Sequence, residues 1–283
     1  MRSAKNTAAF SLVELSIVLV ILGLLVGGVL SGRSLIRAAE IRNITVEFQQ
    51  WQTAVNTFRG KYNALPGDMR NATSFWGNAS NGAMTGECTN ALNASGSGKQ
   101  TCNGNGDGKI GSYDGSSTLV YVEWMRFWQH LSNAGLIEGS YKGVPSSGTP
   151  GDADFKLFGT GDVIPASKVG GAAWSVYHAE ASGWESFEMV NYMVFGSTGE
   201  LTSSPPVPLH GVITPEEAWG IDTKFDDGNP GMGSVRSAPM YPAAAQRCWN
   251  FTGSQSYSWE NVKNHTQYAL SNTANNCSLW FKL

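Results

Sequence analysis

A single carboxylate, Glu14, lies near the start of the most apolar stretch of this 283-residue chain. From Leu15 to Gly32 there are 18 residues without a charged side chain, enough as a helix to cross most of a hydrocarbon core of roughly 30 Å. A carboxylate at that depth costs roughly 2.5–3.5 kcal/mol unless it finds a partner. Cleavage of the chain just before Phe10 would create an amine one helical turn away, which could neutralise Glu14.

The residues before this stretch follow a recognisable order. A nine-residue leader carries Arg2 and Lys5 as its charged side chains and ends in Ala9. Phe10, a serine, two aliphatic residues and Glu14 come next. This order resembles the N-terminal processing signal of type IV pilins and type II secretion pseudopilins, although the family usually has Gly where this chain has Ala9. The resemblance implies cleavage between Ala9 and Phe10 by the prepilin peptidase, N-methylation of Phe10, and packing of the helix into a filament core with Glu14 pairing to that amine.

The apolar stretch fits a secretory signal peptide or a simple membrane anchor less well. A cleaved signal peptide has an apolar core of about 7–15 residues followed by a cut site. The stretch here is longer, and residues 33–39 continue the helical pattern. A simple membrane anchor fits the length and the charges but gives no reason for Glu14, so the pilin-like interpretation is favoured.

A second group of oxygen-bearing side chains occurs near the middle of the chain. Asn103, Asn105 and Asp107 alternate with glycines, and Asp114 stands at the twelfth place. The pattern resembles an EF-hand-type calcium loop, in which Lys109 would contribute its carbonyl oxygen. Only two ligands are charged, so weak binding is expected, at about 10⁻⁴–10⁻³ M. The alternative is a Gly/Asn turn tightened by a disulfide bond; calcium is favoured.

Four cysteines allow three disulfide pairings. Neither a CxxC motif nor a Cys/His cluster with zinc spacing occurs, so a metal–thiolate site is not expected. In an oxidising compartment the simplest pairs are Cys88–Cys102 and Cys248–Cys277. The alternative is four free, buried thiols.

Composition places the chain among exported globular proteins. It is 41% hydrophobic and 14% charged and contains 34 glycines, which is typical of a loop-rich protein. The formal net charge of −3 becomes −5 once the two basic residues of the leader are removed. No basic stripe stands out, so nucleic-acid binding is not favoured. Because the positively charged residues of the leader stay on the cytoplasmic side, we expect a single-pass inner-membrane protein with a periplasmic head before assembly. After assembly we expect it in a pilus or pseudopilus.

One long helix must position Glu14 and carry the rest of the chain. Beyond the charged residues that follow the apolar stretch, apolar side chains recur every three or four residues and predict one buried stripe. Pro66 predicts that the helix ends near Leu65. The expected divisions are a leader (1–9), a long helix (10–65) with a transmembrane half (10–32) and an amphipathic half (33–65), and a globular head (66–283). The stripe comprises Ile41, Ile44, Phe48, Trp51, Val55, Phe58 and Tyr62.

The head is predicted to be loop-rich, with few regular elements. Residues 71–109 are predicted to form an extended loop and residues 119–137 an amphipathic helix with a core-facing aromatic side. Residues 187–195 are the best strand candidate, and 174–178 are its expected partner. The fold class is therefore α+β: a long N-terminal helix packed on a loop-rich head with a small antiparallel sheet.

A short helix is predicted from Thr214, its cap, with Pro215 at the first position, to about Phe225. Asp222 and the pair Asp226–Asp227 make an acidic cluster at its end. Solvated caps and turns are favoured there over a second cation site, because the spacing matches no known calcium loop.

The function expected from these features is that of a structural subunit, either a major or a minor pilin or pseudopilin. Its partners would be other such subunits, the prepilin peptidase and the inner membrane. The first alternative is a tip-located minor pilin that binds a surface, a secreted substrate or DNA. A membrane-anchored periplasmic enzyme is a weaker alternative, because no catalytic constellation can be assembled from the motifs, and we expect no enzymatic activity.

Overall fold

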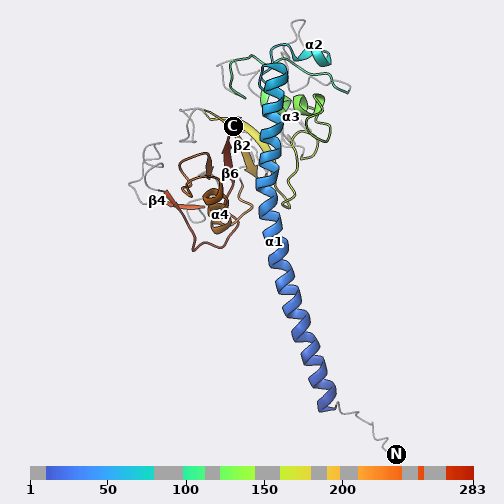
Figure 1. Cartoon of the computed structure of the whole chain (residues 1–283), viewed down its shortest axis with the longest axis vertical. Helices are drawn as coiled ribbons and strands as arrows, with labels where there is room; N and C mark the ends of the chain where they lie inside the picture. Colours follow the sequence, from blue (N-terminus) through green and yellow to red (C-terminus); the bar gives the residue numbers. More distant parts are fainter. Residues whose placement is uncertain are drawn as a thin grey trace, which may run out of the picture. The chain divides into compact units, whose positions relative to one another are not determined.

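The computed structural model describes residues 11–79, 98–111, 122–143, 160–179, 190–197, 210–237, 248–251 and 266–283. The chain divides into two compact units, Met1–Asn43 and Ile44–Leu283. The fold class is α+β, as predicted: a long N-terminal helix is followed by a head with a four-stranded antiparallel sheet (Figure 1).

Helix α1, Leu12–Tyr62, runs unbroken for 51 residues (Figure 1). Its first turn is fixed by two hydrogen bonds that involve Ser11. Ser11 Oγ accepts from the Val13 N–H (3.2 Å), and Glu14 Oε2 accepts from the Ser11 N–H (2.8 Å). This arrangement is close to a capping box, in which a Glu at the third helical position satisfies the cap residue. Glu14 therefore has a local structural role besides the one expected from the sequence.

The helix ends at Tyr62, before the expected Leu65. Asn63 adopts a left-handed conformation with φ of 51°, and its N–H bonds to the Arg59 carbonyl oxygen (2.9 Å). Asn is one of the few residues that tolerate this conformation at the end of a helix. The helix is thus stopped by Asn63, and Pro66 lies beyond the end.

In the first unit, α1 exposes its aliphatic side chains. This segment is long and apolar enough to cross a membrane, by length and composition. The Leu, Ile and Val residues from Leu12 to Ile36 are each at least 50% exposed. Such an apolar helix surface needs a lipid or protein environment to cover it.

In the second unit, the remainder of α1 buries most of the predicted stripe, with Trp51 and Tyr62 half-buried. Ile44, Phe48, Val55 and Phe58 are buried, and the Phe48 ring stacks on Phe281 with centroids 4.5 Å apart. The same helix therefore changes from an exposed aliphatic surface to a buried aromatic one.

The four-stranded sheet has the order β1-β2-β6-β3 and is antiparallel throughout. The predicted pairing of strand 174–178 with strand 187–195 is confirmed as β1 and β2, with Trp174 opposite Phe195. Residues 187–189 lie outside the described residues. A separate hairpin is formed by β4 and β5. The strands are β1 Ala173–His178, β2 Asn191–Gly196, β3 Val235–Ser237, β4 Trp249–Phe251, β5 Thr266–Tyr268 and β6 Leu279–Lys282.

Three shorter helices complete the described head. The predicted helix 119–137 appears as α3, Val122–Asn133, with its aromatic side buried as expected; residues 119–121 lie outside the described residues. Trp128 packs edge-on against Trp51, with ring centroids 5.4 Å apart. Helix α4, Pro215–Phe225, has the predicted cap and a full capping box. Helix α2, Ala72–Trp76, lies in a region predicted to be loop, where a five-residue helix leaves no readable periodicity.

The disulfide bond Cys248–Cys277 is present, as predicted, and joins the residue before β4 to the segment before β6. Cys102 is buried and disulfide-bonded. Its expected partner, Cys88, lies outside the described residues, as do Ala9 and Phe10.

Candidate functional site

Three acidic side chains from distant parts of the chain meet beside the predicted calcium loop. Asp68 follows α1, Asp107 belongs to the loop, and Glu123 lies in the first turn of α3. One carboxylate oxygen from each lies within 4.8 Å of the others. Asp68 and Glu123 are buried, whereas Asp107 is exposed. Such a group could hold a divalent cation, because carboxylate oxygens are the ligands that hard cations prefer.

Asp68 is held by the backbone of the loop. Its Oδ1 accepts from the N–H groups of Gly106 and Asp107, the latter at 3.1 Å, and its Oδ2 accepts from the Gly108 N–H at 2.8 Å. These bonds fold the loop around the carboxylate and fix its direction.

Glu123 is held in the same way from the other side. Its Oε1 accepts from the Asn105 N–H (2.8 Å) and its Oε2 from the Gly111 N–H (3.3 Å). The loop is anchored further to the sheet, because Asn191 Oδ1 accepts from the Ile110 N–H (2.9 Å).

Two glycines allow the backbones to approach each other here. A Cβ at Gly67, where φ is +83°, would clash with the carbonyl oxygen of Glu123. A Cβ at Gly104 would clash with the backbone of residues 67 and 68. Neither contact tolerates a side chain, so these glycines are needed to bring Asp68 and Glu123 to the loop.

Burial is the main cause of the altered acidity of this site. It raises the pKa of Glu123 to about 8, opposed by the Asn105 hydrogen bond and assisted by the charge of Asp68. Burial also raises the pKa of Asp68, against the opposing backbone bonds. At neutral pH the group therefore retains a proton that a cation could replace.

The side-chain oxygens of the predicted calcium ligands in the loop accept hydrogen bonds from the backbone. Asn103 Oδ1 accepts from the Thr73 N–H (2.9 Å). Asn105 Oδ1 accepts from the Asp107 N–H (2.9 Å), and Asp107 Oδ1 from the Lys109 N–H (2.8 Å). Asp114 lies outside the described residues. Asp107 is thus the predicted ligand that the structure joins to other acids, whereas no local pattern in the sequence points to Asp68 or Glu123.

A second acidic cluster, Asp222, Asp226 and Asp227, lies at the end of α4. Contrary to expectation Asp222 is not solvated: it is fully buried and accepts from the Tyr268 hydroxyl (2.9 Å). Burial raises its pKa to about 7, and the Tyr268 bond opposes the shift. Asp227 caps the turn as predicted, accepting from the Asn229 N–H (2.8 Å).

His130 on α3 is fully buried within a polar network. Its Nδ1 accepts from the Gly67 N–H (3.0 Å), and its Nε2 lies 2.9 Å from the Thr101 hydroxyl, which donates to Gln129 Oε1 (2.7 Å). Burial, and then the charge of Arg126, lowers the pKa of His130 to about 3. An imidazole that is fully buried and has a polar partner at both ring nitrogens has a structural role here.

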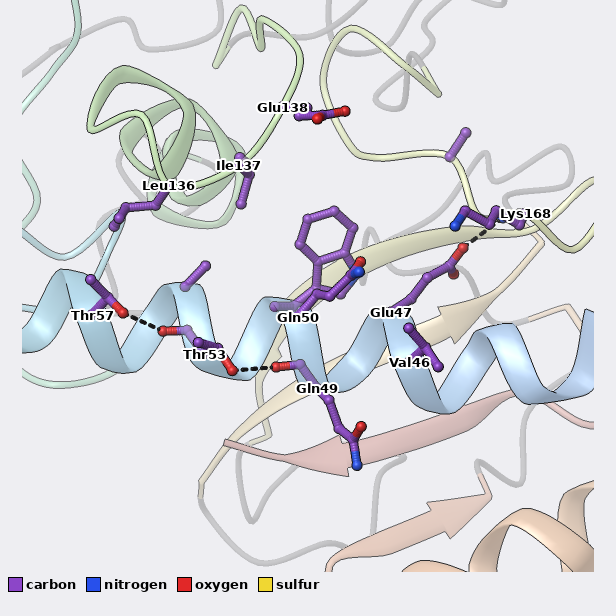
Figure 2. A pocket seen from close by; sticks show the side chains of 13 residues that line it. Val46, Glu47, Gln49, Gln50, Thr53, Thr57, Leu136, Ile137, Glu138 and Lys168 are labelled. Atoms are coloured by element: carbon purple, nitrogen blue, oxygen red, sulfur yellow. Dashed lines mark hydrogen bonds between the residues drawn. The ribbon is translucent and has the colours of Figure 1, made fainter.

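A solvent-open hollow of about 700 Å³ lies along α1 between residues 46 and 57. Figure 2 shows its walls: α1, the turn with Leu136, Ile137 and Glu138, and the segment carrying Lys168. Glu47 at its base is already satisfied, accepting from Lys168 N (2.8 Å) and from two side chains of residues 167–174. The hollow therefore offers a contact surface, with the buried carboxylate of Glu47 already satisfied and the exposed Glu138 at its wall.

The fold and these sites together define a class: an α+β protein with a membrane-length N-terminal helix and a head whose described residues include two acidic clusters. Comparison of the chain with protein-family models, with curated proteins and with solved structures gives no match.

Proposed function

We propose that the chain is a subunit of a type IV pilus or a type II secretion filament, anchored in the inner membrane before assembly and polymerising through α1. The observation that supports this best is the pairing of an exposed, membrane-length aliphatic segment with a single acid at its start. Prepilin peptidase and neighbouring subunits are the expected partners. The rest of the chain forms a periplasmic or extracellular head without a catalytic role.

In this proposal Glu14 pairs with the processed amine of Phe10 on a neighbouring subunit. A buried carboxylate satisfied at one axial offset would fix the register of the filament. Helix capping is a competing role for this acid, since the bonds between Glu14 and Ser11 need no second subunit. The test must therefore separate charge from helix capping.

The substitution Glu14→Gln makes that separation, because Gln can fill the same capping position without a charge. We expect Glu14→Gln to insert in the membrane and retain helicity but to give few sheared filaments. Ser11→Ala removes the cap and keeps the charge, so it should assemble. Equal filament yields from Glu14→Gln and the unaltered chain would contradict the pairing of Glu14 with the Phe10 amine. A mature protein that still begins at Met1 by mass spectrometry would contradict the proposal that the chain is a filament subunit.

The acidic group on the head is proposed to bind calcium. Asp68, Asp107 and Glu123 would supply carboxylate oxygens. The loop would add backbone carbonyl oxygens, as predicted for Lys109, because the side-chain oxygens of Asn103 and Asn105 already accept backbone N–H groups. The support is the burial of two acids whose pKa values are raised together, a situation that a divalent cation relieves. Bound calcium would fix the loop against α3 and the sheet.

Calcium binding can be measured on the full chain in detergent by titration calorimetry. Glu123→Gln should weaken binding about tenfold or more, because it removes a charged ligand. Asp114→Asn tests the EF-hand-type ligand set predicted from the sequence, and Asp222→Asn is a matched control at the second cluster. No heat of binding at millimolar calcium would exclude the site.

Subunit position is the remaining part of the proposal. A minor, tip-located subunit is favoured over a major one by the size of the head, residues 66–283, relative to a simple filament subunit. Imaging of labelled protein along filaments tests this, since signal confined to one end supports a minor subunit and uniform decoration supports a major one.

A further inference from the structure

An aromatic cluster lies where α1 ends and α2 begins, with Phe75 exposed and Tyr62 and Trp76 half-buried. Tyr62 lies 5.2 Å from Phe75 and 5.5 Å from Trp76, and Phe75 lies 6.0 Å from Trp76, measured between ring centroids. Phe75 is 55% exposed, whereas most aromatic rings of the described head are buried or half-buried. A contiguous apolar patch that reaches the surface is a candidate binding surface.

The cluster rests on a rigid base. Trp76 is half-buried and packs against His130 (5.3 Å) and Phe58 (6.3 Å), and both of these residues are fully buried. The rings therefore have little freedom to turn into the core, and binding to them would not require ordering a flexible segment.

The exposed charges next to the rings are positive. Lys61 Nζ lies 5.1 Å from the centroid of Tyr62, and Arg59, three residues before Tyr62, is its neighbour on the helix surface. Between residues 59 and 79 the single acid is Asp68, which is buried and satisfied by backbone N–H groups. The segment from residue 59 to residue 79 thus carries three cations, Arg59, Lys61 and Arg70, in a chain whose formal net charge is −3.

We propose that Tyr62, Phe75 and Trp76, flanked by Arg59 and Lys61, form a platform that binds an acidic polysaccharide. A sugar ring with a carboxylate presents an apolar C–H face to an aromatic ring and an anionic edge to the cations beside it. The inference goes beyond the proposed filament function, because it names what the head binds and does not depend on polymerisation.

The ring geometry favours a sugar over single-stranded nucleic acid. Successive bases need a row of stacking surfaces along a positive groove. Here the three rings are inclined to one another by 46° to 85°, so they make one compact platform and no row. A peptide would need an open strand edge or a groove, and the described hollow lies elsewhere on α1, at residues 46–57.

Binding can be tested with the full chain in detergent and polygalacturonate oligomers as the probe, using a glycan-coated sensor. Phe75→Ala and Lys61→Glu should each weaken binding about fivefold or more. Both side chains are exposed, so neither change is expected to unfold the head. Trp219→Ala is the matched control, because Trp219 is 42% exposed and lies on α4; its affinity should not change.

Four results would overturn the inference. These are absence of binding at millimolar polygalacturonate, equal affinity for neutral dextran, tighter binding to an oligothymidylate, and an equal loss in the Trp219→Ala control. Filament assembly is not part of the assay, so failure here leaves the proposed function standing, and failure of the filament experiments leaves this inference standing.

Discussion

The two halves of α1 each carry an acid that must be satisfied, and they satisfy it differently. Glu14, in the exposed aliphatic half, accepts from the N–H of Ser11, three residues away. Glu47, in the half that belongs to the head, is buried and accepts from Ser167, Lys168 and Trp174. The first contact is local and leaves the helix free to meet another molecule, whereas the second ties the helix to residues 120 or more positions away.

One continuous helix therefore has two structural roles. The aliphatic side chains of its first half stay exposed in the described part of the first unit, so their sequence is constrained by an outside environment. Its second half is constrained by the core of the head. Substitutions in the two halves should therefore affect different properties, namely assembly for the first and folding stability for the second.

The largest expected effect is that of Phe48→Ala. Phe48 is buried and stacks on Phe281, so its truncation should lower the free energy of unfolding of the head by about 3–5 kcal/mol. Denaturant titration of the full chain in detergent, followed by near-UV circular dichroism, measures it. A loss below about 1 kcal/mol would mean that the helix is not a structural part of the head.

Glu47→Ala should have the next largest effect. It leaves the Trp174 indole N–H, the Ser167 hydroxyl and the Lys168 N–H without their acceptor in a largely buried place. We expect a loss of about 3 kcal/mol in the same assay, because each unsatisfied buried donor is costly. Glu40→Ala is the control: Glu40 is a partly exposed acid on the same helix, paired with Arg37, and should cost less than about 1 kcal/mol.

The pH dependence of stability should also arise from acidic groups in the head. The folded pKa of Glu123, about 8, lies above its ordinary value of 4.5, so the folded state binds more protons between these values. The contribution of Glu123 to stability should then be fully present below pH 4.5 and be lost as the pH rises to about 8 and beyond, a loss of several kcal/mol without calcium. Added calcium should remove the fall.

Two variants test which carboxyl groups cause this pH dependence of stability. Glu123→Gln should flatten it, because the titrating group is gone. Asp222→Asn should remove a smaller part of the same slope, since the folded pKa of Asp222, about 7, is also raised. If the pH dependence of stability were unchanged in Glu123→Gln, the Glu123 carboxyl would not be its cause.

Local patterns predict the helices and strands of this chain better than they predict the site. The stripe from Ile44 to Phe58, the capped start of α4 and the β1–β2 pair each depend on neighbouring residues, and each is present. Asp68 and Asp107 are 39 residues apart and meet only because the backbone turns at Gly67 and Gly104. No periodicity encodes that meeting, so the sequence alone predicts a loop with ligands from its own residues.

The sequence also predicts too late an end for α1, because Pro66 is a stronger signal than Asn63.

The smallest effect on stability is expected from Leu24→Ala, in the exposed half of α1. Leu24 is exposed, so its truncation removes no buried contact in the described structure. The free energy of unfolding of the head should change by less than about 0.5 kcal/mol. Filament yield is the complementary measurement: if the exposed half is the assembly surface, the same substitution should reduce it. A variant that destabilises the head but assembles normally would reverse the roles assigned to the two halves of the helix.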